Sequence, residues 1–106
     1  MSCVLQVIDL PPSLRLIREV ITRAVESQLP RSPEFEHNKS PSGYPQWVMS
    51  KGDNRFPLVV MTLQSPTIVV IETDDRDIFV AVEASLRVAF VRGKEKLSSD
   101  ITIQLV

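Results

Sequence analysis

The sequence has little of what several classes of protein require. Its single cysteine, Cys3, excludes a disulfide within the chain and a cysteine-rich zinc site. No apolar run approaches the roughly 20 residues of a membrane-spanning helix. The first residues contain no basic cluster and reach Asp9 too early for a signal peptide. From these absences we expect a cytoplasmic protein that has no membrane partner.

An excess of charge of one sign is also missing. Twelve Lys and Arg residues stand against thirteen Asp and Glu, for a formal net charge of −1. A dedicated nucleic-acid binder usually has a basic footprint, and this composition does not supply one. With 43% hydrophobic residues, the chain of 106 residues has enough apolar content for one core. We therefore expect a single domain over residues 1–106.

The clearest periodic pattern predicts an amphipathic helix over Leu14–Leu29. Apolar residues recur there at intervals of three and four, the spacing of a stripe that faces a core. Ser13 occupies the N-cap position, and Pro30 is expected to end the helix. Before the helix, Val4–Leu10 is rich in β-branched residues and predicts a short strand, closed by two prolines.

Residues 31–55 contain three prolines and two glycines among many polar residues, which is typical of a long irregular loop. Its aromatic residues Phe35, Tyr44 and Trp47 are expected to anchor the loop to the domain. Within it, Gln46–Met49 is a candidate for a brief strand. His37 has no partner nearby in the sequence, so we expect a solvated side chain rather than a base or metal ligand.

Four short runs rich in valine, isoleucine and phenylalanine follow, over Pro57–Gln64, Thr67–Thr73, Asp77–Ala84 and Leu86–Arg92. The breaks between them are too short for parallel crossovers, so neighbouring runs are expected to pair as antiparallel hairpins. Ile101–Val106 alternates as a last strand. The prediction is an α+β fold, in which a short N-terminal strand and one amphipathic helix accompany a mostly antiparallel sheet of four to six strands.

A second interpretation of residues 78–91 stays open, because their apolar residues also recur at roughly helical spacing: Ile78, Val82, Leu86, Ala89 and Phe90. Runs of β-branched residues favour a strand over a helix, so the strand is the preferred prediction. Just before this segment, Asp74, Asp75 and Asp77 form an acidic cluster without a calcium-loop pattern. We expect turn-forming aspartates there, and we predict no metal or other cofactor.

Three stretches of the sequence resemble one known family in their order and spacing. They are Gln6–Asp9 with the helix that follows, Ile21–Val25 inside that helix, and Arg55–Leu63 continued by Thr67–Ile71 and Asp77–Val80. Together they are similar to the amino-terminal part of the plant ribosome-inactivating proteins, the rRNA N-glycosylases. The likeness covers most of this chain but only the first part of a complete family domain.

The resemblance implies a plant-defence toxin that inhibits protein synthesis by removing one adenine from large-subunit rRNA, with the ribosome as partner. Phe79 stands where the family has a tyrosine that stacks on the adenine, and Val80 where a backbone group bonds the base. Glu83 and Arg87 correspond to the catalytic pair in the family's Glu-Ala-x-Arg stretch, with one extra residue between them. No second stacking tyrosine follows, so a shortened, weak or inactive N-glycosylase is expected.

The geometry of Glu83 and Arg87 depends on the open choice for residues 78–91. On a helix, residues i and i+4 share a face, whereas along a strand they would lie about 13 Å apart, too far to act as one pair. The sequence also leaves an alternative function of another class. It is a non-catalytic interaction module that binds a protein partner through a sheet edge or through the proline-rich loop.

Overall fold

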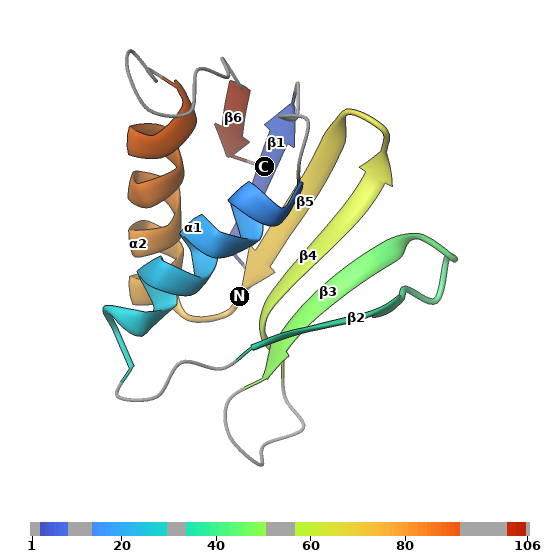
Figure 1. Cartoon of the computed structure of the whole chain (residues 1–106), viewed down its shortest axis with the longest axis horizontal. Helices are drawn as coiled ribbons and strands as arrows, with labels where there is room; N and C mark the ends of the chain where they lie inside the picture. Colours follow the sequence, from blue (N-terminus) through green and yellow to red (C-terminus); the bar gives the residue numbers. More distant parts are fainter. Residues whose placement is uncertain (1–2, 9–13, 30–33, 51–56, 92–101, 106) are drawn as a thin grey trace.

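A computed structural model of the chain describes residues 3–8, 14–29, 34–50, 57–91 and 102–105. Two helices pack with a six-stranded sheet (Figure 1), which confirms the predicted α+β class. The elements, in chain order, are β1 (Cys3–Ile8), α1 (Leu14–Glu26), β2 (Phe35–Lys39), β3 (Pro45–Ser50), β4 (Pro57–Ser65), β5 (Ile68–Thr73), α2 (Arg76–Leu86), a π-helical turn (Arg87–Val91) and β6 (Thr102–Leu105).

The first strand and the first helix were predicted correctly from local patterns. In α1 the buried residues are Ile17, Ile21, Ala24 and Val25, which are members of the predicted stripe. Backbone hydrogen bonds continue past Glu26 into a final turn, so the helical path extends close to the predicted end. The predicted N-cap Ser13 and the predicted stop at Pro30 lie outside the described residues.

The prediction of an irregular loop over residues 31–55 is wrong for the middle of that segment, where β2 and β3 form an antiparallel hairpin. Of the prolines and glycines that suggested a loop, Pro41 and Gly43 lie in its turn and Pro45 begins β3. Gly43 has a φ of +87°, a conformation that suits glycine because it has no Cβ, and its N–H donates to the Ser40 carbonyl at 2.8 Å. The brief strand suggested for Gln46–Met49 is confirmed as part of β3.

The sheet has the strand order β2-β3-β4-β5-β1-β6, and every neighbouring pair is antiparallel. The β4–β5 hairpin was predicted from its two apolar runs and its short break at Ser65 and Pro66. β1 pairs with the other side of β5, and β6, the predicted last strand, pairs with β1. As a result, both edges of β5 are already occupied when the chain leaves it.

The strands predicted for Asp77–Ala84 and Leu86–Arg92 are wrong, because this segment forms α2 and the π-helical turn. Asp75 is the N-cap: its Oδ1 accepts hydrogen bonds from the backbone N–H groups of Asp77 at 2.9 Å and Ile78 at 3.1 Å. The aspartates after β5 thus begin a helix, as the alternative interpretation allowed.

Two physical reasons explain why α2 is not a strand. No edge of β5 remains free for a hairpin partner, so the segment crosses to one face of the sheet. There, a helix buries Ile78, Val82 and Leu86 together on one stripe. β-Branched residues lower helix propensity by only about 0.5 kcal/mol each, whereas burying one such side chain contributes about 1.5 to 3 kcal/mol.

The core lies between the two helices and one face of the sheet, which we call the helix-side face. The strands contribute alternate residues that are almost inaccessible to solvent: Leu5, Val7, Met49, Val59, Met61, Val69 and Ile71. Against them the helical segments bury Ile17, Ile21, Val25, Ile78, Val82, Leu86 and Phe90. The opposite face of the sheet, the outer face, has no described helix over it.

Candidate functional site

The four site residues predicted from the sequence lie on α2 and at its C-terminal end. Phe79, Glu83 and Arg87 follow one another at intervals of four, so each lies about 40° around the helix from the one before. They therefore form one stripe. Val80 lies about 100° from Phe79 on the same helix, and its side chain is 54% exposed.

Glu83 and Arg87 form an ion pair with each other. The guanidinium Nη2 of Arg87 donates to Oε2 of Glu83 at 3.1 Å. The side chain of Arg87 is 43% exposed and that of Glu83 is 23% exposed. The helix has thus brought the predicted pair together, which a strand would not have done. Exposed pairs of this i,i+4 type are common on helix surfaces and contribute only about 0.3 to 0.5 kcal/mol.

Phe79 has a structural role that limits its use as a stacking platform. Its ring is half-buried and packs against the hydrophobic core. A groove of about 410 Å³ runs between α1 and α2, but its lining includes Ala84, Ser85 and Val88 rather than the predicted stripe. The structure therefore pairs Glu83 with Arg87 but places neither of them, nor Phe79, in the lining of that groove.

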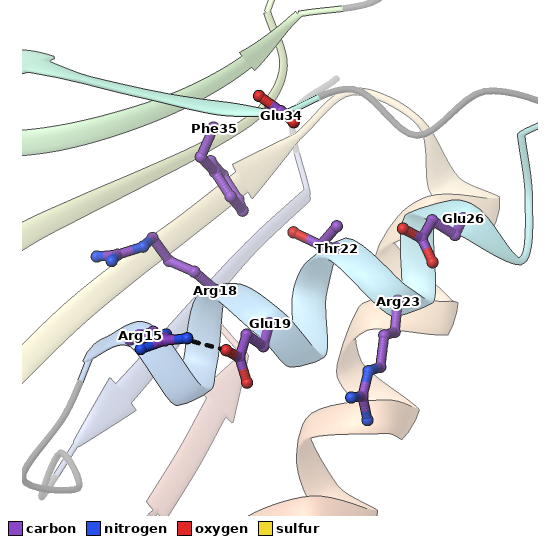
Figure 2. A pocket seen from close by; sticks show the side chains of 8 residues that line it. All are labelled: Arg15, Arg18, Glu19, Thr22, Arg23, Glu26, Glu34 and Phe35. Carbon is purple, nitrogen blue, oxygen red and sulfur yellow. Dashed lines mark hydrogen bonds and ion pairs between the residues drawn. The ribbon is translucent and has the colours of Figure 1, made fainter.

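A second groove, of about 440 Å³, lies between α1 and the start of β2 (Figure 2). The ring of Phe35 points from β2 toward the helix, and Nε of Arg15 donates to Oε1 of Glu19 at 3.1 Å. Three arginines and three glutamates line this groove, so their formal charges cancel. A groove with balanced charge does not attract a ligand of one sign over the other.

Trp47 on β3 is enclosed by two side chains that sequence reasoning did not connect to it. The Arg18 guanidinium lies 5.1 Å from the centroid of the indole ring, within the range of a cation–π interaction. The His37 ring lies 4.9 Å from the indole at an interplanar angle of 32°. His37 is exposed to solvent, as predicted, and the indole ring is its neighbour across the hairpin. No local signal could have linked α1 with the hairpin.

The outer face carries six apolar side chains on four adjacent strands: Val4, Ile8, Val48, Val60, Ile68 and Val70. Five are half-buried, and Val70 is 7% exposed. The outer face of an antiparallel sheet that meets water usually carries polar residues at these positions. In this sheet, the strands carry apolar side chains on the outer face as well as on the helix-side face.

Polar residues on the outer face are mainly amides and hydroxyls rather than charged groups. In the middle cross-strand row, Gln46, Thr62 and Gln6 accompany Val70, and Nε2 of Gln46 donates to the Thr62 hydroxyl at 3.2 Å. The strand register places Glu36 and Glu72 on this face as well. It places no lysine or arginine there among the described residues.

The edges of the sheet differ from its interior. The edge strand β2 is Phe-Glu-His-Asn-Lys and mostly exposed, and the edge strand β6 has only four residues. Short or charged edges are a common protection against pairing with other chains. The valine- and isoleucine-rich strands, which could pair with another chain most readily, lie inside the sheet.

Comparison of this chain with family models, with curated proteins and with solved structures found no match. Among the described residues, no three His, Cys, Asp or Glu side chains come together to hold a metal ion. No helix in the described part of the chain is long and apolar enough to cross a bilayer. The function must therefore be inferred from the surfaces of the molecule.

Proposed function

We propose that this chain is a non-catalytic interaction module that docks a protein partner on the outer face of its sheet. The observation that supports the proposal is the set of six apolar side chains on a face that no described helix covers. Removal of apolar surface from water stabilises a complex by about 25 cal/mol per Å². Apolar side chains gathered on one surface of a small domain often mark a binding site.

A face is a better docking surface than an edge in this sheet. An added strand would have to pair with β2 or β6, which are polar or short. A partner on the outer face would instead contact side chains of β3, β4, β5 and β1 together. On this face the apolar side chains lie on both sides of a middle row made mainly of amides and hydroxyls, so a partner would meet both apolar and hydrogen-bonding groups.

Photo-crosslinking in the cells that express the chain tests this proposal. Benzoylphenylalanine at Gln6, on β1 in the middle cross-strand row of the outer face, is expected to form an adduct of discrete mass upon irradiation. The same probe at Glu26, an exposed residue of α1, is the matched control and should form none. Absence of a discrete adduct at Gln6, or equal adducts at both positions, would reject the outer face as the docking surface.

A second candidate is the N-glycosylase activity implied by the family resemblance. The observation that favours it is the helical geometry of residues 76–91, which places the Glu83 carboxylate 3.1 Å from the Arg87 guanidinium. In such a site the carboxylate would stabilise a cationic sugar or activate water, and the arginine would polarise the departing adenine. The ion pair would have to open for either group to reach a substrate.

Incubation of the chain with intact ribosomes, followed by aniline cleavage of the rRNA, tests the second candidate. Catalysis predicts a released rRNA fragment, which the Glu83→Gln variant should lose while retaining its fold. No fragment at high protein concentration would eliminate the candidate. A fragment of equal yield from the wild-type chain and the variant would indicate a contaminating enzyme.

A further inference from the structure

We infer that the partner on the outer face is a second copy of this chain, so that two sheets pack face to face as a symmetric dimer. This inference rests on the proposed function and names its partner. It depends on the chemistry of the outer face, on the placement of its charges and on its dimensions.

The side chains of the outer face are complementary to themselves. Valine and isoleucine at six positions can pack against the same residues of another copy. Each of the amides of Gln6 and Gln46 and the hydroxyl of Thr62 contains both a donor and an acceptor, so it can bond an identical group. A face built on lysines, arginines or many carboxylates would instead need a partner of opposite charge.

Electrostatic repulsion between two copies of this face is weak. The chain has a formal net charge of −1, so two copies repel each other weakly. Glu72 lies two residues along β5 from Val70, in the cross-strand row next to the middle row. A two-fold axis along the middle row would place the two Glu72 residues on opposite sides of it, about 13 Å apart along the strands. Salt screens charges at that separation.

The dimensions of the sheet suit a small, reversible interface. Six strands about 4.8 Å apart, each with about five residues of 3.3 Å rise, give a flat area on the order of 500 Å². Stable interfaces bury about 800 Å² on each partner, and weaker ones bury less. Stacked sheets pack about 10 Å apart, with their strands turned by about 30°. Because a two-fold contact of this kind closes on itself, association should stop at the dimer.

Sedimentation of the purified full chain from micromolar to millimolar concentration tests the inference. The average mass should rise from that of the 11.9 kDa monomer toward twice that value and then stop rising. Val60→Lys places a charge on the outer face, in the cross-strand row next to the middle row, and should weaken association by at least about tenfold. Val88→Lys is the matched control, because that valine is 78% exposed beside the helices, and its association should remain unchanged.

A charge-reversal experiment separates loss of the interface from loss of the fold. Gln6→Lys and Gln6→Glu should each be monomeric and should form a mixed dimer when combined, because a two-fold axis along the middle row places residue 6 opposite residue 6 of the other copy. Gln6 is already polar and only half-buried, so a charged side chain at this position should leave the fold intact. Recovery of the dimer upon mixing supports the inference. Failure of folded variants to recover it overturns the inference.

The result also distinguishes the inference from the proposed function. If the chain stays monomeric up to millimolar concentration but the Gln6 probe forms a crosslink of a mass other than twice that of the chain, the partner is a different protein. That result overturns the dimer inference and supports the outer face as a docking surface. A monomeric chain without a Gln6 crosslink overturns both. A dimer weakened equally by Val60→Lys and Val88→Lys overturns the face-to-face arrangement.

Discussion

The two faces of one sheet differ in what covers them more than in what they are made of. Val59 and Val69 on the helix-side face are fully buried, whereas their sequence neighbours Val60 and Val70 lie on the outer face. Strands that are apolar on both faces are typical of sheets with cover on both sides. In the described part of this chain, helices cover only the helix-side face, so the outer face is the candidate for docking.

The largest expected effect is on folding stability, and it compares one isoleucine on each face. Ile71→Ala removes a side chain that is 1% exposed beneath the helices, and the cavity should cost about 2 to 5 kcal/mol. Ile68→Ala on the half-buried outer face should cost less than half as much. Urea denaturation of dilute protein measures both free energies of unfolding. Equal losses would mean that the outer face is covered in the monomer.

The second prediction concerns α2, one of the two helices that cover the core. Asp75→Ala removes the side chain that accepts two backbone hydrogen bonds at the start of the helix, and should lower the free energy of unfolding by about 1 kcal/mol. Asp75→Asn can accept the same bonds and is the matched control. If alanine and asparagine behave alike in thermal denaturation, the cap does not hold this helix in place.

The third prediction concerns the end of the helix-side face near the β2–β3 hairpin, where a single arginine covers the indole of Trp47. Arg18→Ala should lower the free energy of unfolding by about 0.5 to 1 kcal/mol, because the cation–π contact is lost. It should also change the fluorescence of the only tryptophan in the chain. Arg15→Ala is the control, since its exposed side chain pairs with Glu19 instead. An unchanged spectrum in Arg18→Ala would place that guanidinium away from the indole.

The smallest expected effect is at the predicted catalytic pair, which lies on the surface of α2. A double-mutant cycle of Glu83→Gln and Arg87→Gln should give a coupling energy of about 0.3 to 0.5 kcal/mol that decreases with added salt. This value describes ordinary surface pairing. A coupling several times larger that salt does not reduce would indicate a desolvated pair and would favour the catalytic candidate.

Prediction from the sequence succeeded where a single segment contains the whole signal. The stripe through Ile17 and Ile21 specifies α1, and the break at Ser65 and Pro66 specifies a hairpin. Prediction failed around Gly43, because proline and glycine are common both in hairpin turns and in irregular loops, so their presence did not distinguish the two. For the candidate site, it selected Glu83 and Arg87 but could not connect Trp47 with Arg18, which lies 29 residues earlier in the chain.

Local order in this chain, from the amphipathic α1 to the β4–β5 hairpin, follows from periodicity and turn chemistry alone, because those forces act between near neighbours. Residues 76–91 form a helix because β1 occupies the second edge of β5, which leaves the later segment no strand to pair with. That long-range pairing also determined which valines the helices bury and which form the outer face. No short stretch of sequence contains it, because the competing partners lie more than sixty residues apart.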